Sequence, residues 1–446
     1  MRVQTGCVVV VVVGLIAAGC SRSSSGSSKS KTSGAASTVA SGDFGTLKGV
    51  CGPGNAKGAT APGVTDGTVA VGTMADPGAP SQPGLDQELF DSADAFVAWC
   101  NAAGGILGRK LVLHKWDSKL TEVASRMIES CSSDFALVGN GEALDEGGVD
   151  QRVKCGLPEI PTYDVSKKAG TAPLSVQPLP NPDYSSGLYA AYVHLKQVDP
   201  EAVKHYAMLS SQFQSVKDAG NKDRAAAEAA GYTTVYYDEL PLVVDNWRPY
   251  VQNLQTKGVQ VVTVESSPQP IAAMYKAMDD VGYHPKYAIF NTNMYDPTFV
   301  ENAGSALQGS VYISSVFAPF ERAASGTATR QYIDDLAKYA NGAKPKQLGA
   351  QAWSAWLLFA ESVKACGSNL TRSCLLDHAK SRPSWTGGGL HAPSHPGDAT
   401  APGPQCFVLL QASPAGFTVD TKVTKPNTGV FNCSPSNAFR LPGFPK

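Results

Sequence analysis

Short apolar runs alternate with helical segments between residues 68 and 316, and this alternation constrains the fold more than any other feature. The runs are rich in β-branched and aromatic residues, which is typical of strands buried on both faces of a parallel sheet. We predict strands at residues 68–74, 110–116, 135–139, 205–210, 233–238, 259–265, 287–291 and 311–316. Between them, apolar residues recur at helical spacing, as at Leu89, Ala93 and Phe96. The sequence therefore predicts an α/β fold with crossover connections.

A double glycine, Gly104 and Gly105, separates the first predicted helix from the second predicted strand. Glycine adopts the left-handed backbone conformation without a Cβ penalty, so it commonly follows the last turn of a helix. We interpret the pair as a helix stop without a chemical role.

Residues 1–19 look like an export signal, because Arg2 precedes an apolar stretch of twelve residues, 7–18. A membrane-spanning helix needs about 20 apolar residues, so this stretch is too short to cross a bilayer. It ends in AAGC, which resembles the lipobox of bacterial lipoproteins and implies a lipid on Cys20. An ordinary secretory signal cleaved nearby is the alternative.

Residues 20–50 are dominated by Ser, Gly, Ala and Thr, with almost nothing to bury. We therefore expect the lipid anchor to be followed by a disordered tether over this stretch. The expected location is extracytoplasmic, in the cell envelope, with the chain anchored to the membrane by its lipid.

The ten cysteines include Cys7 and Cys20 of the leader, which leaves eight in the exported chain. None of the eight forms a CxxC pair or has a histidine cluster beside it, so we expect no metal site. An even number in an exported chain indicates disulfides. Many connectivities are open, and the simplest is sequential pairing of Cys51 with Cys100, Cys131 with Cys155, Cys366 with Cys374, and Cys406 with Cys433.

The sequence lacks the GxSxG, HExxH and P-loop motifs of common enzyme classes. An SxxK sequence, Ser28 to Lys31, lies in the tether, where no pocket forms around it. His391 and His395 stand beside prolines that prevent a shared helical face, so we interpret them as part of a polar surface loop. We expect no catalytic residues, no cofactor and no enzymatic activity. The net charge of −1 gives no reason to expect a nucleic-acid partner.

Polar, small or aromatic residues follow six of the strands. Ligands of open α/β sheets bind at the carboxyl ends of strands, so these loops favour a binding cleft between two sheets. The candidate ligand-binding residues are Ser81, Gln82, Asn140, Gly141, Thr162, Tyr163, Asp164, Gln212, Phe213, Ser266, Ser267, Thr292, Asn293 and Tyr295.

Residues 101–111, NAAGGILGRKL, resemble a hallmark of the branched-chain amino-acid (Leu/Ile/Val) type of periplasmic binding protein. These proteins are the type I solute receptors of ABC transporters. Four later segments resemble the family in the same order, at residues 155–166, 180–193, 274–304 and 309–319. The likeness runs from about residue 68 to residue 407.

The resemblance implies two Rossmann-like lobes that close on a ligand by hinge bending. We place the N-terminal lobe at residues 51–181 and 318–383, and the C-terminal lobe at residues 182–317 and 384–446. The chain would cross between the lobes near residues 179–182, 316–319 and 382–386. The resemblance also supports a disulfide between Cys131 and Cys155, whereas the tail after Ser413 lies beyond it.

The acid that pairs with the ligand ammonium in this family aligns with Thr292. An unpaired buried charge is costly, so a pocket without that acid suits a free amino acid poorly. The neighbouring amides and hydroxyls predict a small ligand with neutral hydrogen-bonding groups and an aromatic or apolar part against Phe213 and Tyr295. In the alternative, Asp164 or Glu265 replaces the missing acid.

These features favour a lipid-anchored, monomeric solute-binding protein of amino-acid transport type. It would capture a small polar molecule, such as an amino acid or an amide, and deliver it to an ABC permease. A sensor of the same fold that signals to a membrane partner is one alternative. An anchored extracytoplasmic hydrolase is another, and it would need a nucleophile beside a base, for which we find no motif.

Overall fold

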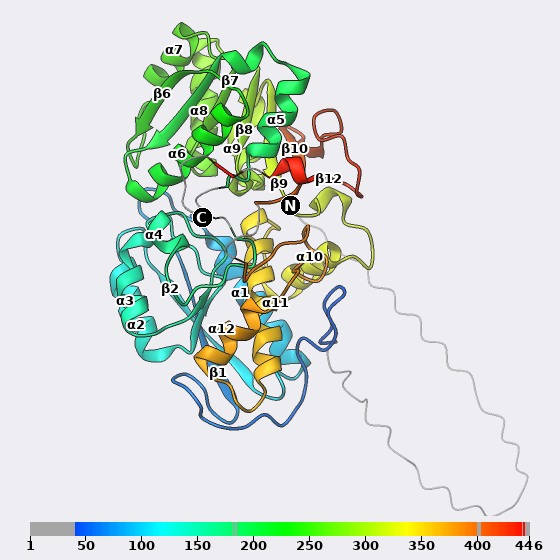
Figure 1. Cartoon of the computed structure of the whole chain (residues 1–446). Helices are drawn as coiled ribbons and strands as arrows, with labels where there is room; N and C mark the ends of the chain where they lie inside the picture. The colour runs from blue at the N-terminus through cyan, green and yellow to red at the C-terminus, as the bar shows by residue number, and fades with distance from the viewer. Residues whose placement is uncertain (1–40, 181, 183–184, 399–402, 439, 442–446) are drawn as a thin grey trace, which may run out of the picture. The chain divides into compact units, whose positions relative to one another are not determined.

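The computed structural model describes residues 41–180, 182, 185–398, 403–438 and 440–441 of the chain (Figure 1). The predicted export signal, the lipid on Cys20 and the tether up to residue 40 lie outside these residues. Two sheets made mainly of parallel strands, with helices around them, form most of the described structure. The predicted α/β class is confirmed.

The first sheet contains four parallel strands in the order β2-β1-β3-β4. They are β1 (Thr68–Ala75), β2 (Lys110–Asp117), β3 (Ala136–Val138) and β4 (Glu159–Ile160). The helices of this stretch are α1 (Gln87–Ala103), α2 (Val123–Ser133), α3 (Val149–Lys154) and α4 (Lys167–Gly170). β1 and β2 pair along their full lengths, which places their carboxyl ends level at one edge of the sheet.

The second sheet runs in the order β11-β10-β9-β8-β7-β5-β6, with β12 paired to β10. Its strands are β5 (Tyr206–Ser211), β6 (Thr234–Leu240), β7 (Val261–Val264), β8 (Tyr287–Phe290), β9 (Ser310–Ser315), β10 (Cys406–Ser413), β11 (Gly416–Val419) and β12 (Asn432–Cys433). Its helices are α5 (Tyr189–Val198), α6 (Gln214–Ala229), α7 (Arg248–Thr256), α8 (Pro268–Val281) and α9 (Pro297–Ala303). β5 to β9 pair in parallel, whereas β10 is antiparallel to β9. Each of the eight predicted strands overlaps an observed strand.

Helices cover both faces of the second sheet. Successive strand residues point to opposite faces. Met208 packs with residues of α5 and α6, whereas Ala207 and Leu209 pack with residues of α7, α8 and α9. Because both faces are buried, these strands are continuous apolar runs in the sequence.

The chain returns to the first sheet after β9. Helices α10 (Ala328–Tyr339), α11 (Gln347–Cys366) and α12 (Arg372–Lys380) share one hydrophobic core with α1, β1 and β3. These yellow to orange helices lie against the blue and cyan elements in Figure 1. We call the first sheet with α1–α4 and α10–α12 the first lobe, and the second sheet with α5–α9 the second lobe. The residue boundaries given above for the lobes stay a prediction.

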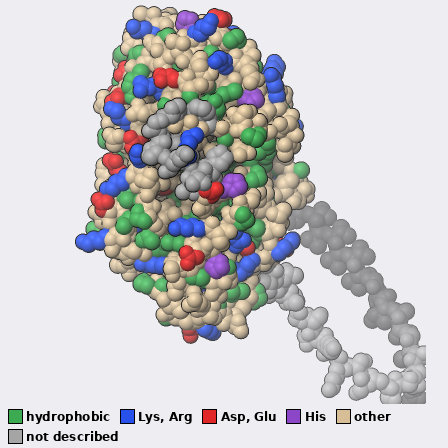
Figure 2. Space-filling model, viewed as in Figure 1, with side chains coloured by type: hydrophobic (Ala, Val, Ile, Leu, Met, Phe, Trp, Pro, Cys, Tyr) green, Lys and Arg blue, Asp and Glu red, His purple; other side chains and the backbone are tan. Residues whose placement is uncertain are grey.

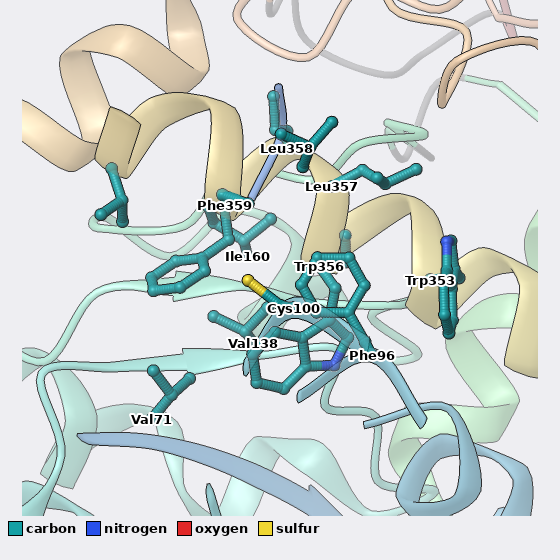
Figure 3. Close-up of a cluster of buried hydrophobic side chains, with 14 of the residues drawn as sticks. Val71, Phe96, Cys100, Val138, Ile160, Trp353, Trp356, Leu357, Leu358 and Phe359 are labelled. Atoms are coloured by element: carbon teal, nitrogen blue, oxygen red, sulfur yellow. The ribbon is translucent and has the colours of Figure 1, made fainter. Parts of the chain in front are cut away.

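The core of the first lobe is built around α11, in which every residue except Lys364 and Ala365 is buried. Trp356 stacks on Phe96 of α1 with ring centroids 5.4 Å apart, and Trp353 meets the same ring edge-on at 5.2 Å. Figure 3 shows these rings packed beside aliphatic side chains of the sheet. The predicted apolar stripe of α1 faces this core and is confirmed.

Residues 41–50 belong to the folded structure, so the expectation of a tether up to residue 50 is wrong over this stretch. Phe44 is fully buried, with its ring centroid 6.2 Å from that of Trp99 and 5.6 Å from that of Trp353. Val50 is also fully buried in the first-lobe core. The Ser- and Gly-rich composition conceals these two apolar anchors, which complete an aromatic cluster contributed by distant parts of the chain.

The eight cysteines after residue 50 form four disulfides in sequential order. The bonds are Cys51–Cys100, Cys131–Cys155, Cys366–Cys374 and Cys406–Cys433. The simplest of the open connectivities is therefore the observed one, and the bond supported by the family resemblance is confirmed.

The double glycine ends α1 as predicted. Gly104 and Gly105 have positive φ angles of 122° and 83°. Their N–H groups donate to the carbonyl oxygens of Asn101 and Cys100 in the last turn, at 3.2 and 2.8 Å. The turn then leads directly into β2.

Within the described ranges, none of the helices combines the length and the apolar character that a bilayer crossing requires. On the face that Figure 2 shows, Lys and Arg side chains are interspersed with Asp and Glu. This viewed surface therefore has mixed charge, in keeping with the net charge of −1 of the whole sequence.

Candidate functional site

A cavity of about 1320 Å³ lies between loops that follow strands of both sheets. The first lobe contributes loops after β1, β3 and β4, and the second lobe contributes loops after β6, β7 and β8. We call this cavity the cleft. It lies where ligands of open α/β sheets bind, and it exceeds the roughly 300–1,000 Å³ of common small-molecule pockets.

Half of the fourteen candidate binding residues line the cleft. They are Gln82, Tyr163, Asp164, Ser266, Ser267, Thr292 and Asn293. They come from four separate loops of the two lobes, which the fold brings to one place. Their contact with a ligand stays a prediction.

The two aromatic side chains expected against the ligand do not line the cleft. Phe213 is 36% exposed and borders a separate, shallow surface pocket at the start of α6. Tyr295 is buried, stacks on Phe320 with centroids 4.8 Å apart, and accepts a hydrogen bond from the Phe320 N–H at 2.9 Å. Its hydroxyl also bonds to Glu321, so the ring fixes the segment after β9. Neither residue therefore forms an aromatic wall of the cleft in this structure.

The remaining candidates also lie off the cleft, for two reasons. Ser81 is exposed, and Gln212 points its amide at the carbonyl oxygen of Glu239, 3.2 Å away, on the exposed edge of the second sheet. Asn140, Gly141 and Thr162 are instead buried under neighbouring side chains.

Tyr163 is the residue that covers this buried loop. A Cβ on Gly141 would lie 2.6 Å from a carbon of the Tyr163 ring, so the ring rests directly on the glycine. The Tyr163 hydroxyl donates to Asp86 Oδ2 at 2.9 Å. Burial raises the pKa of Tyr163 well above its usual value, with a further rise from the Asp86 charge, so the phenol stays a donor. Tyr163 of the first lobe therefore presents an aromatic surface to the cleft, which Phe317 also lines.

A buried ion-pair triad joins the lobes beside the cleft. Lys346 Nζ lies 3.2 Å from Glu88 Oε2 at the start of α1 and 2.9 Å from Asp296 Oδ2 at the start of α9. Burial alone would lower the pKa of Lys346, but the charges of Glu88 and Asp296 raise it overall, so the lysine remains protonated. No pattern in the sequence indicates the triad, because Glu88 and Lys346 are 258 residues apart.

The second lobe presents an acidic pair to the cleft. The Asn291 amide donates to Asp223 Oδ2 at 2.8 Å and to Glu265 Oε1 at 3.0 Å, and Ser186 Oγ donates to Asp223 Oδ1 at 2.6 Å. Burial raises the pKa of Glu265 well above its usual value, and the Asp223 charge raises it further. Sequence reasoning named Glu265 as an alternative acid but missed Asp223, which lies within the charge-rich helix α6.

The first lobe presents Asp164, which accepts a hydrogen bond from the Gln177 amide. Burial raises its pKa well above the usual value, followed by the charges of Glu159 and Asp145. Burial also raises the pKa of Asp145, to about 6. Asp164 and Glu265, which the sequence analysis named as alternatives to the missing acid at position 292, both line the cleft.

A buried serine–histidine contact lies outside the cleft. His391 Nε2 is 2.9 Å from Ser354 Oγ, and Trp385 Nε1 donates to the same oxygen at 2.9 Å. Burial lowers the pKa of His391 to about 4, which leaves a poor base at neutral pH. The expected surface loop is thus wrong for His391, which packs in the core, whereas His395 is exposed and lines the cleft.

One cluster in the described part of the chain has metal-ligand spacing, formed by Cys366, Cys374 and His378. The two sulfur atoms are bonded to each other. Because thiolates bind metal ions and disulfide sulfurs do not supply them, this cluster is not a metal centre.

Comparison with known proteins relates this architecture to solute receptors. Residues 68–416 match the family model described as periplasmic binding protein. A fatty acid ABC transporter substrate-binding protein from Thermomonospora curvata shares the fold with a TM-score of 0.70 and 16% identity, covering 88% of this chain and 99% of that chain. No curated protein matches the sequence significantly.

Two further solved structures share the fold. An ABC transporter solute-binding protein from R. palustris in complex with 4-hydroxybenzoate has a TM-score of 0.64 and 14% identity, covering 79% of this chain and 95% of that chain. A leucine-binding protein from Thermotoga maritima also has a TM-score of 0.64, with 11% identity over 79% of this chain and 97% of that chain. At such identities the likeness is one of fold.

Proposed function

Since the chain belongs to the periplasmic binding protein family, we propose that it is a receptor that captures a small polar molecule by lobe closure and delivers it to an ABC permease. The observation that carries this proposal is the cleft, which polar side chains from both lobes line at the carboxyl ends of their strands. Amino acids and amides are the ligand classes that the sequence suggested. The relatives named for leucine, 4-hydroxybenzoate and fatty acids widen the set to other small organic molecules.

Hydrogen bonds that join the lobes around the cleft support closure as the capture step. Ser215 Oγ of α6 donates to the carbonyl oxygen of Ala143 at 3.0 Å. Gln269 Nε2 of α8 donates to the carbonyl oxygen of Pro83 at 3.2 Å. Each such bond contributes about 0.5–1.5 kcal/mol, so a few of them hold a closed state that thermal motion still opens.

We also propose that the receptor is a monomer in the cell envelope, extracytoplasmic and anchored to the membrane through a lipid on Cys20. The AAGC motif supports the anchor. The four disulfides support an oxidising, extracytoplasmic compartment, because disulfides are rare in the cytosol.

The test combines a ligand screen with a measurement of closure, on the full chain. Leucine, hexanoate, 4-hydroxybenzoate, acetamide and small amines are screened by thermal shift. A ligand at a hundred times its Kd adds about 2.7 kcal/mol of stability. Small-angle X-ray scattering with the best compound should then show a smaller radius of gyration. Stabilisation without compaction would contradict capture by lobe closure.

Ser215→Ala probes the closure contact without touching a residue that lines the cleft. Loss of one hydrogen bond worth about 0.5–1.5 kcal/mol should raise the apparent Kd by about two- to tenfold. The matched control is Ser132→Ala, an exposed serine at the end of α2.

Uptake of the identified compound by cells with and without the protein separates transport from sensing.

A further inference from the structure

The polar part of the cleft is rich in carboxyl groups. Seven acidic and four lysine side chains line it. One of these lysines, Lys346, is already shared between Glu88 and Asp296.

In the first lobe, internal carboxylates occupy the main-chain donors at the strand ends. Asp145 accepts hydrogen bonds from the N–H groups of Val165 and Ser166, at 2.7 and 3.1 Å. Asp76 accepts from those of Leu120 and Ala143, at 2.6 and 2.9 Å. A ligand carboxylate needs such N–H groups as partners, and here they are already engaged by the protein's own acids.

The surroundings of these loops also repel an anion. Glu142 is 4% exposed, its Oε1 has no hydrogen-bond partner among the described residues, and the charges of Asp76 and Asp164 act on it. The buried guanidinium of Arg152 forms an ion pair with Glu159 at 2.9 Å, so its charge is already balanced within the protein. Glu142 Oε1 is thus an acceptor without a donor, and Asp164, one of the acids that act on it, lines the cleft. This arrangement favours a ligand that brings N–H groups and positive charge.

In the second lobe, the Asn291 amide bridges Asp223 and Glu265, and the Asp223 charge adds to burial in raising the pKa of Glu265. The other charged group that acts on Glu265 is Lys222, which attracts it. The hydroxyl oxygen of Thr292, in the same loop as Asn291, is buried without a hydrogen-bond partner in the described chain. An ammonium group placed here would donate up to three hydrogen bonds and neutralise the second negative charge.

We propose that the ligand of the cleft is a protonated organic amine without a carboxylate group, with its ammonium bound by Asp223 and Glu265. This inference rests on the proposed function, because it takes the cleft to be the solute site. When the amine binds, the proton held by Glu265 leaves to solvent and the ammonium takes its place. The apolar remainder of the amine lies against leucine and proline side chains such as Leu240 and Pro241.

Isothermal titration of the full chain with matched triplets tests this proposal. One triplet is isoamylamine, leucine and isoamyl alcohol, and the other is tyramine, tyrosine and tyrosol; spermidine, hexanoate and 4-hydroxybenzoate complete the set. We expect at least one amine to bind tenfold or more tightly than its amino acid and alcohol counterparts, a difference of about 1.4 kcal/mol. We also expect binding to release protons, seen by comparing buffers of different ionisation enthalpy near pH 7.

Variants locate the site. Glu265→Gln and Asp223→Asn should each weaken amine binding at least tenfold, while Glu201→Gln, at an exposed acid of the second lobe, leaves it unchanged. Thermal unfolding without ligand that matches the unsubstituted protein shows that a variant is folded. If Glu265→Gln and Asp223→Asn are both folded and both still bind the amine as before, the proposal is overturned. If only a carboxylate, an amino acid or an alcohol binds, the amine proposal fails and the solute-binding function stands. If no compound binds and no closure is seen, both fail.

Discussion

Replacing Phe44 by alanine tests whether residues 41–50 are part of the first-lobe core. Phe44 is fully buried against the rings of Trp99 and Trp353. Phe→Ala in a core costs about 3–5 kcal/mol through lost transfer energy and the cavity left behind. Because a segment before the first strand can shift to fill part of the gap, we expect the lower end, about 3 kcal/mol. At about 2–4 °C per kcal/mol for a domain of this size class, the Tm should fall by about 6–12 °C.

The assay is thermal unfolding of the full chain, followed by near-ultraviolet circular dichroism, which reports on the packed tryptophans. Thr46→Ala is the matched control, because its side chain is exposed in the same segment and surface changes usually stay within about 0.5 kcal/mol. A Tm for Phe44→Ala within the error of the control would show that these residues are a tether after all, and would refute the packing argument.

Three further results are expected. Cys20→Ala should move the protein from the membrane fraction to the soluble fraction, and unchanged partition would refute lipid anchoring. Alkylation and mass measurement should find no free thiol at Cys131 or Cys155, and a free thiol at either position would contradict the bond. Loss of the bond should lower the free energy of unfolding by no more than the roughly 2–5 kcal/mol seen in small exported domains. Burial raises the pKa of Asp145 to about 6, above its unfolded value of about 3.9, so its contribution to stability is full below about pH 4 and is lost as the pH rises through about 6. Asp145→Asn should flatten the fall in stability between pH 4 and 6, and an unchanged slope would disprove the assignment.

The sequence by itself determined the elements of the fold, because their causes are local. Two-sided burial makes each parallel strand a continuous apolar run, and the α1 stripe of Leu89, Ala93 and Phe96 follows from helical periodicity. The helix stop at Gly104 and Gly105 follows from a backbone conformation that glycine alone adopts freely. The family resemblance supplied the two-lobed arrangement, which local patterns do not encode.

Tertiary structure decided which side chains form the site. Strand ends indicated four loops whose predicted residues line the cleft, but the direction of each side chain depends on what packs over it. Tyr163 covers Gly141, and Tyr295 turns away to Phe320. The surroundings of charged residues also depend on the tertiary structure. Asp223 lies in a charge-rich helix and resembles a solvated residue in the sequence, but the fold buries it beside Glu265. Burial and long-range pairing, such as that of Glu88 with Lys346, arise only when distant segments meet, and these two effects set the electrostatics of the cleft.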